Sequence, residues 1–284
     1  MQNDKLGTLY VVATPIGNLQ DITLRAIEIL KKVSLIAAED TRHAAPLLKH
    51  YLINKPILSL HEFNERERLK TILTYLQQGE SIALMSDAGT PLISDPGFLL
   101  IREAKAAGLP VVPVPGACAA VAALSVAGLP SDKFIFEGFL PVKQVARENR
   151  LMLLRHETRT IIFYEAPHRL LAVLGSMITI FGDTRKAVTA RELTKIHESV
   201  MTGTLESLLQ HFSTHTNQVR GEIVILVEGI NEEAQLAKEV LPERVLTILL
   251  EEMPLKQAAA LASKITGERK NVLYEMALKK KRKC

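Results

Sequence analysis

Two carboxylates and a guanidinium stand next to one another early in the chain. Glu39, Asp40 and Arg42 come directly after the apolar segment 35–38. Charged groups beside a buried segment cost free energy unless they are paired or take part in chemistry, so the cluster is a candidate for proton transfer. Two structural alternatives are open. The first is an Asp40–Arg42 ion pair, and the second is Asp40 as the N-cap of a helix.

Three further clusters combine glycine with polar or small residues, and each follows a predicted strand. They are residues 14–19 (TPIGNL), 86–97 (SDAGTPLISDPG) and 115–119 (PGACA). In open α/β sheets, ligands bind at the carboxyl ends of the strands. One such cluster is typical of an ordinary turn. Three of them, all after strands, favour a binding site.

The common phosphate, nucleotide and hydrolase motifs are missing from the sequence. It contains no GxxxxGKS/T and no GxGxxG after the first strand, which argues against a phosphate-binding loop and a dinucleotide-binding fold. It also contains no HExxH, CxxC or GxSxG. The usual zinc protease, redox and serine hydrolase classes are therefore excluded.

The hydrophobic pattern predicts two α/β regions. Apolar strands at 9–13, 35–38, 56–60, 81–85 and 110–114 alternate with helical segments, which is typical of a largely parallel sheet. Strands at 134–136, 160–164, 187–190 and 222–227 predict a second α/β layer with a mixed sheet. Asp21 is the predicted N-cap of the first helix. Asn64 and Glu67 form a predicted capping box for the third.

The chain changes character after Gly229. Pro254 begins a predicted helix, the pair Thr266–Gly267 breaks it, and a second helix follows. Two short helices around a glycine turn suggest a helix-turn-helix unit, although a helical hairpin that packs on the main body has the same pattern. Residues 268–284 hold seven Lys or Arg against two Glu, whereas the whole chain carries a net charge of +4. This concentration of positive charge favours a nucleic-acid partner.

Composition limits the class of protein further. The only two cysteines among 284 residues, Cys118 and Cys284, form no disulfide framework and fit the reducing cytoplasm. The N-terminus has no signal-peptide pattern. Segment 106–131 carries no charge, but its prolines would break a helix before it crossed a bilayer. We therefore expect no membrane association.

Several motifs together resemble a known family. They are segments 14–19, 38–42 and 86–91, followed by 139–141 (FLP), 163–170 (FYEAPHRL) and 190–195 (ARELTK). In this combination the chain resembles the tetrapyrrole methylase superfamily, and in particular the branch that methylates ribosomal RNA. The resemblance covers residues 7 to 229 and extends into the C-terminal helices.

The resemblance implies a fold and an activity. It implies an N-terminal α/β domain (1–115), a second α/β domain (116–230) and a C-terminal helical unit that contacts RNA (231–284). S-adenosylmethionine would lie in the cleft between the two α/β domains and donate its methyl group, without a metal. The acceptor would be the ribose 2′-hydroxyl of a cytidine in 16S rRNA of the small ribosomal subunit. A cytoplasmic homodimer is also implied.

The resemblance also implies roles for individual residues. The donor would contact the turn 86–91, the start of the following helix and two strand ends of the second domain. The implied donor-binding residues are Asp87, Ala88, Gly89, Thr90, Ile93, Cys118, Ala119, Tyr164, Glu165 and Leu193. For Tyr164 and Leu193, ordinary core packing is the alternative. The catalytic candidates come instead from the polar residues at strand ends that would face the cleft. They are Asp40, Arg42 and Lys195, with Glu39, His61 and Asp95 as further candidates. For His61, an ordinary surface histidine is the alternative.

Two other functions remain open from the sequence. The first is methylation of a corrin-type tetrapyrrole, the substrate that names the superfamily. The second is a non-enzymatic nucleic-acid regulator, with a ligand-sensing α/β body and a helix-turn-helix output. The charged cluster at 39–42 distinguishes the enzymes from the regulator, because a sensor needs only the ligand contacts.

Overall fold

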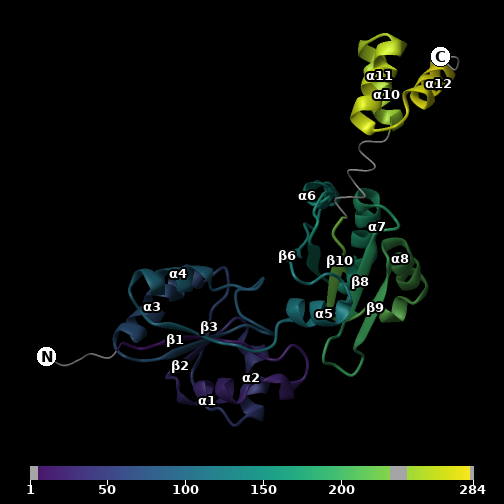
Figure 1. The fold of residues 1–284 in the computed structure, drawn as a ribbon. Coiled ribbons are helices and arrows are strands. Elements are labelled where there is room, and N and C mark those ends of the chain that lie inside the picture. The colour runs from purple at the N-terminus through teal and green to yellow at the C-terminus, as the bar shows by residue number, and fades with distance from the viewer. Residues whose placement is uncertain (1–5, 231–241, 282–284) are drawn as a thin grey trace. The chain divides into compact units, whose positions relative to one another are not determined.

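The computed structural model describes residues 6–230 and 242–281 (Figure 1). The chain forms two compact units. One comprises the residues up to Arg155 together with Arg159–Glu228, and the other comprises His156–Thr158 with the residues from Gly229 onward. The domain boundaries predicted at 115 and 230 stay predictions.

The first sheet is entirely parallel. Its strands are β1 (Leu9–Val12), β2 (Leu35–Ala38), β3 (Ile57–Ser59), β4 (Ile82–Met85) and β5 (Val111–Val114), in the order β3-β2-β4-β1-β5. Helices α1 (Leu24–Lys32) and α2 (Thr41–His50) cover one face, and α3 (Glu65–Gln77) and α4 (Phe98–Ala106) cover the other (Figure 1). Strands covered on both faces need continuous apolar runs, which explains sequences such as LIAA in β2. The predicted parallel sheet is confirmed.

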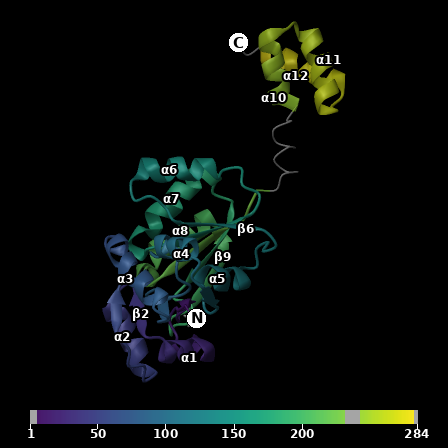
Figure 2. The same ribbon diagram turned by 90° about the vertical axis from the view of Figure 1, so that its left-hand side faces the viewer.

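The second sheet is mixed, as predicted. Its strands are β6 (Phe134–Phe139), β7 (Thr160–Glu165), β8 (Lys186–Arg191), β9 (Ser199–Thr204) and β10 (Ile223–Val227), in the order β6-β7-β10-β8-β9. Only the β6–β7 pair is parallel. Helix α5 (Ala119–Ala127) covers one face. Helices α6 (Gln144–Leu153), α7 (Leu170–Phe181) and α8 (Leu205–Thr214) pack on the other (Figure 2). The uncharged segment 106–131 thus includes a strand and a short helix.

The predicted N-cap Asp21 is wrong, whereas Asn64 stands at the N-cap of α3 as predicted but without the predicted capping box. Asp21 lies inside a 3-10 turn, η1 (Leu19–Asp21), and Thr23 is the N-cap of α1 because its hydroxyl accepts from the backbone N–H of Ala26. Asn64 makes no cap bond to α3. Its side chain turns back to the preceding loop and accepts from the N–H of His61. Short polar side chains satisfy whichever backbone donor lies nearest, so a sequence pattern alone does not locate a cap. Two further 3-10 turns are η2 (Pro167–Arg169) and η3 (Thr216–Gln218).

The C-terminal unit contains three described helices rather than the two predicted. They are α10 (Pro242–Glu252), α11 (Leu255–Thr266) and α12 (Lys270–Lys281). Gly267, in the left-handed region, ends α11 as predicted. The unit encloses a small core of Leu246, Ala258, Ala259, Ala262, Leu273 and Ala277. Residues 282–284 of the basic tail and the predicted start of the unit at 231 lie outside the described residues.

None of the helices within 6–230 and 242–281 combines the length and the apolar character that a membrane span requires.

The core of the second sheet offers a test of packing. Phe163 is fully buried among side chains of α6, α7 and α8. Phe163→Ala should lower the free energy of unfolding by about 3–5 kcal/mol, because truncation leaves a cavity. Urea unfolding followed by circular dichroism measures the change. Phe63, which is 89% exposed, provides the matched control, and Phe63→Ala should change stability far less. Equal effects of the two substitutions would contradict this packing.

Candidate functional site

Four loops meet at the carboxyl edge of the first sheet. They follow β1, β2, β4 and β5, which are neighbours in the strand order. Thr14 and Gly89 exchange two backbone hydrogen bonds of 2.9 and 3.1 Å, which join the loops after β1 and β4. The N–H of Asp40 donates to Oδ1 of Asp87 at 3.0 Å, which joins the loops after β2 and β4. Backbone and side-chain bonds therefore hold the loops in place together.

The loop after β4 has an unusual backbone. Gly89 has a φ of +80°, and a Cβ there would lie 3.3 Å from Cγ2 of Ile16. Leu92 and Ser94 also have positive φ values, of 72° and 74°. Left-handed backbone at residues with a side chain costs roughly 1–2 kcal/mol each. Such strain gathers at functional sites, where the surrounding structure imposes the conformation.

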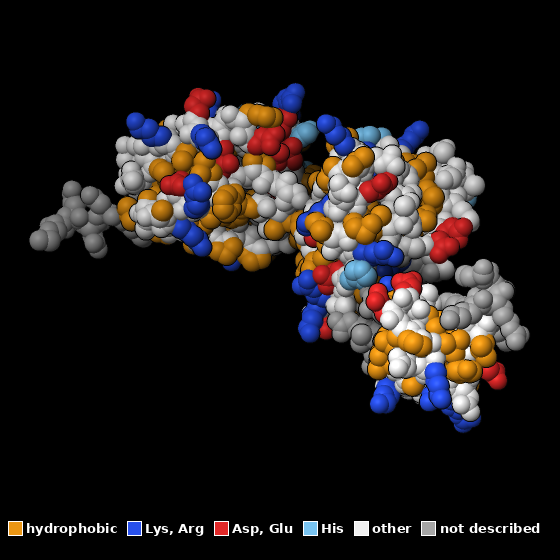
Figure 3. Space-filling view, turned by 90° about the horizontal axis from the view of Figure 1, so that it is seen from above, with side chains coloured by type: hydrophobic (Ala, Val, Ile, Leu, Met, Phe, Trp, Pro, Cys, Tyr) orange, Lys and Arg blue, Asp and Glu red, His pale blue; other side chains and the backbone are white. Residues whose placement is uncertain are grey.

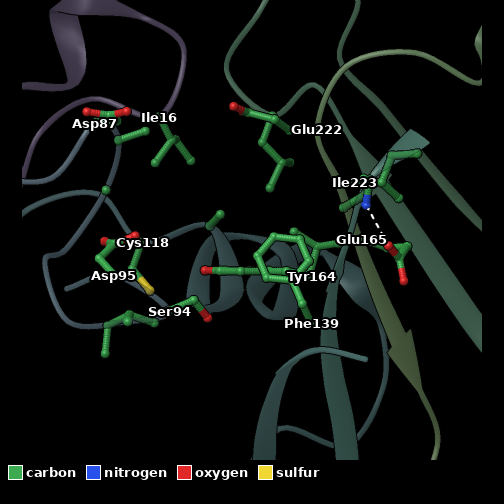
Figure 4. A pocket seen from close by; sticks show the side chains of 18 of the residues that line it. Ile16, Asp87, Ser94, Asp95, Cys118, Phe139, Tyr164, Glu165, Glu222 and Ile223 are labelled. Atoms are coloured by element: carbon green, nitrogen blue, oxygen red, sulfur yellow. Dashed lines mark hydrogen bonds between the residues drawn. The ribbon is translucent and has the colours of Figure 1, made fainter. Parts of the chain in front are cut away.

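This loop borders a cavity of about 490 Å³ (Figure 4). The loops described above, the start of α5 and strands β6, β7, β8 and β10 contribute to its walls. All ten residues that the resemblance implied for donor binding line it: Asp87, Ala88, Gly89, Thr90, Ile93, Cys118, Ala119, Tyr164, Glu165 and Leu193. The structure thus brings together residues from segments far apart in the sequence.

Tyr164 forms a wall of the cavity. Its hydroxyl accepts a hydrogen bond of 3.1 Å from the N–H of Ala120, at the start of α5. Its ring makes edge contacts with Phe136 and Phe139, at centroid distances of 4.8 and 5.8 Å. Burial, followed by the nearby Cys118, raises the pKa of Tyr164, so the phenol stays neutral. Tyr164 therefore supplies an ordered aromatic surface.

Glu165 differs from its neighbour because successive strand residues face opposite sides of the sheet. Its carboxylate accepts from the N–H of Ala166 at 2.8 Å and lies 3.2 Å from Nε of Arg169. Figure 4 shows the carboxylate turned away from Tyr164. Burial raises the pKa of Glu165 despite these partners. The interactions of its carboxylate fix the end of β7.

Carboxylates dominate the charge of the cavity. Glu39, Asp87, Asp95, Glu165 and Glu222 line it, and none of the described lining residues is Lys, Arg or His. Burial and repulsion from Asp87 outweigh a hydrogen bond from Ser86 and raise the pKa of Asp95 to about 6. Burial, followed by three neighbouring carboxylates, also raises the pKa of Glu39. A positively charged ligand would relieve this repulsion, so the lining favours cations.

Asp40 forms both structures that the sequence left open: it pairs with Arg42, and it is a helix N-cap. Asp40 is the N-cap of α2, and its Oδ1 accepts from the N–H of Arg42 at 2.8 Å. The Arg42 guanidinium also binds both carboxylate oxygens, with a shortest distance of 2.6 Å. These bonds hold the pKa of Asp40 well below its usual range. Neither residue lines the cavity, and their catalytic role stays a prediction.

Lys195 lies beside a second cavity, which also includes Gly17 and His50. Its ammonium group binds Glu192 at 2.8 Å and Glu222 at 3.1 Å. Burial alone would lower the pKa of Lys195, but the bonds to both carboxylates prevail and the pKa is raised. The side chain therefore carries a charge near neutral pH. Glu222 links it to the first cavity, which Glu222 lines.

Of the three further catalytic candidates, two lie at the first cavity and one does not. Glu39 and Asp95 line the first cavity, whereas His61 does not. Among the described residues, no group of three or more His, Cys, Asp or Glu side chains is arranged to hold a metal ion.

Sequence reasoning did not assign Ile16, Phe139 or Glu222 to the site, although each lines the first cavity. Ile16 and Phe139 stand inside motifs already noticed, so their positions carried a signal. Glu222 stands just before β10, in a segment that predicts only a strand.

The acidic lining predicts a pH dependence of binding. Asp95 is charged above its raised pKa and becomes neutral as the pH falls through about 6. The pKa of Glu39 is also raised, so its carboxylate gains a proton at a higher pH than an ordinary Glu does. Affinity for a sulfonium compound such as S-adenosylmethionine should therefore fall below pH 6, by up to about tenfold per pH unit for one linked proton. The neutral thioether S-adenosylhomocysteine should show a weaker dependence. Calorimetry between pH 5 and 8 measures both curves, and Asp95→Asn should flatten the first. Parallel curves for the two compounds would contradict this electrostatic argument.

Family models match most of the chain. Residues 8–209 match the model for tetrapyrrole (corrin/porphyrin) methylases. Residues 237–281, which include the three C-terminal helices, match the model described as the RsmI C-terminal HTH domain. Solved structures with the same fold include diphthine synthase, with a TM-score of 0.61 and 14% identity over 78% of this chain and 90% of that one. A uroporphyrin-III C-methyltransferase from Thermus thermophilus complexed with S-adenosylhomocysteine has a TM-score of 0.56 and 16% identity, over 78% and 97% of the two chains.

Curated relatives are similar over nearly their whole length. The ribosomal RNA small subunit methyltransferase I of Pseudomonas aeruginosa is 55% identical over 98% of this chain and 99% of its own. The protein of the same name from Escherichia coli O157:H7 is 51% identical over 96% and 95%. The chain therefore belongs to the tetrapyrrole methylase family, in the group whose curated members are named ribosomal RNA small subunit methyltransferase I.

Proposed function

We propose that this protein transfers a methyl group from S-adenosylmethionine to the 2′-oxygen of a cytidine in 16S rRNA. One observation carries the donor half of the proposal: ten residues expected to bind the donor line a single acid-rich cavity. The names of the close relatives, which span almost the whole chain, support ribosomal RNA as the acceptor.

The cavity suits the donor in size, shape and charge. About 490 Å³ lies within the range of small-molecule sites. Ile16, Ile93 and Phe139 supply apolar walls, and small residues at 88, 89 and 119 let a ligand approach the backbone. The carboxylates around it would stabilise a positively charged sulfur. Bound there, the donor supplies a methyl group that the sulfonium already activates.

The positive charge of the C-terminal unit is concentrated in the sequence KKKRK at residues 279–283, whereas Lys and Arg are matched by Glu in residues 242–278. The unit's exposed basic side chains are Arg244, Lys256, Lys264, Arg269 and Lys270. Figure 3 shows Lys and Arg side chains (blue) at the surface of this unit, at the lower right of the view. We propose that residues 231–284 contact RNA phosphates. From the family resemblance we also propose that the protein acts as a homodimer in the cytoplasm.

The charged residues beside the first cavity would help to keep the reacting groups aligned. A 2′-hydroxyl must be aligned with the methyl carbon and must lose its proton during the reaction. The Asp40–Arg42 pair caps α2, and Lys195 anchors Glu222 at the cavity wall. We propose that Asp40, Arg42 and Lys195 contribute to turnover by holding the start of α2 and the side chain of Glu222 in place.

Methyl transfer from labelled S-adenosylmethionine to small ribosomal subunits tests the function. Label should enter 16S rRNA, and nuclease digestion followed by mass spectrometry should release 2′-O-methylcytidine. Transfer to a tetrapyrrole instead would favour the corrin alternative. RNA binding without any transfer would favour the non-enzymatic regulator.

Gly89→Val should reduce donor affinity by at least tenfold. The branched side chain would stand 3.3 Å from Ile16 at a φ of +80°, and it would occupy space beside the cavity. Calorimetry with S-adenosylhomocysteine measures the loss, and circular dichroism checks the fold. Gly128 also has a positive φ but has open space around its Cβ position, so Gly128→Val controls for backbone strain. Unchanged affinity in Gly89→Val would move the donor site elsewhere.

Removal of all residues after Glu232 should separate donor binding from RNA binding. The donor cavity lies within residues 16–224, so donor affinity should persist. RNA affinity should fall and become less sensitive to salt, because each lost phosphate contact removes roughly 0.7–0.9 from the slope of log affinity against log salt concentration. Filter binding at several salt concentrations measures both effects. Unchanged RNA affinity would place the RNA surface on the basic segment 143–159 instead.

A further inference from the structure

His43 stands beside the donor cavity but does not belong to any motif that the sequence analysis assigned to catalysis. It lies in the first turn of α2, and its Nδ1 is 2.7 Å from Oδ2 of Asp87. Asp87 lines the cavity. The side chain of His43 is 66% exposed, so an acceptor of any size can reach it.

The contact with Asp87 determines which ring nitrogen is basic. An ionised carboxylate can only accept a hydrogen bond, so Nδ1 of His43 carries the proton. The lone pair of the neutral ring then resides on Nε2, for which the described residues provide no hydrogen-bond partner. The other oxygen of Asp87 accepts from the N–H of Asp40. The ring is therefore oriented by a carboxylate that is itself held by the backbone of α2.

The charged groups around His43 favour its protonated form. The bond to Asp87 has the largest effect on the pKa of His43 and raises it above the ordinary value. Asp40 adds to this effect, whereas Arg42 opposes it. An imidazole that gains a proton beside Asp87 thus becomes part of an ion pair, which stabilises the product of a proton transfer.

We propose that His43 is the general base of the reaction, with Asp87 as its positioning residue. This inference rests on the proposed function. The ribose 2′-oxygen attacks the methyl carbon and forms the new C–O bond, while the C–S bond breaks and its electron pair stays on sulfur as a neutral thioether. The proton of the hydroxyl passes to Nε2 of His43. The imidazolium, paired with Asp87, releases that proton to water after the product leaves.

The other candidates are less suited to this step. Both oxygens of the Asp40 carboxylate are engaged by Arg42, and the pKa of Asp40 is depressed. Lys195 is held protonated by two carboxylates. Glu39 and Asp95 line the cavity itself, where their charges would face the donor. His43 combines an exposed lone pair with a fixed orientation.

Single-turnover methyl transfer to small ribosomal subunits, measured from pH 5.5 to 9, tests the inference on the full-length protein. The wild-type rate should rise with pH through the raised pKa of His43 and then level off, because only the neutral ring accepts a proton. His43→Ala should lower the plateau rate by about 100-fold or more and abolish this rise. Its affinity for S-adenosylhomocysteine should stay within about twofold of the wild type. Added imidazole should restore a substantial part of the rate.

Two further variants sharpen the test. His43→Asn keeps a donor toward Asp87 but has no basic nitrogen, so it should fold normally and lose as much activity as His43→Ala. His215→Ala is the control, because it removes another exposed histidine, which contacts Thr214 and His211. This variant should leave the rate unchanged.

The outcomes separate the two hypotheses. Wild-type protein that transfers no methyl group to RNA would overturn the proposed function itself. Normal transfer by the wild type together with normal rates in His43→Ala would overturn only the role of His43. A loss that imidazole does not restore, or a wild-type rate that falls as the pH rises, would also exclude His43 as the base.

Discussion

The site depends on the order of the parallel strands. Because β2, β4, β1 and β5 are neighbours, the loops that follow them leave the same edge of the sheet side by side. The paired backbone bonds between Thr14 and Gly89 then hold two of these loops at a fixed separation. Gly89 is needed at that point because its backbone is left-handed and Ile16 lies close. Thr90 continues the connection, since its hydroxyl donates to the carbonyl of Ala117 just before α5. A chain of short contacts thus joins the first sheet to the start of the second α/β region.

Charge divides the protein into regions with different partners. Carboxylates gather around the cavity, from the buried Glu165 to the exposed Glu222, whereas the excess of Lys and Arg lies in the sequence of the C-terminal tail, residues 279–283. Under the proposed function, the carboxylates of the cavity would attract the positively charged donor, and the basic tail would attract the polyanionic nucleic acid. The net charge of +4 conceals this division. Local fields, rather than the net charge, decide which partner binds where.

The sequence predicted much of the fold and of the cavity for an identifiable reason. Continuous apolar runs mark strands that are covered on both faces, and the residues after them form the ligand-binding edge, as for Asp87 and Cys118. The prediction was weaker wherever a residue depends on a partner distant in sequence. Two features belong to this class: the contact of His43 with a residue 44 positions away, and the place of Glu222 in the wall of the cavity. The cap of α1 is a local error, because Thr23 accepts from the N–H of Ala26, three residues further on. Helix α10 was missed although the sequence carries a signal for it, since Pro242 begins the helix and Pro254 follows its end.

The fully buried core of the C-terminal unit consists of four alanines and two leucines, and six partly buried hydrophobic residues pack against it. Alanine buries little apolar surface, so this unit gains much less hydrophobic free energy than the large Leu, Ile and Phe cores of the α/β sheets. Close helix approach, which small side chains permit, is obtained at the expense of intrinsic stability. This smaller buried apolar area predicts that the three helices open at a lower free energy than the sheets do. A partner that binds only the folded unit would add its binding free energy to the free energy of opening of these helices. The folded fraction of the unit would then rise with the fraction that has bound the partner.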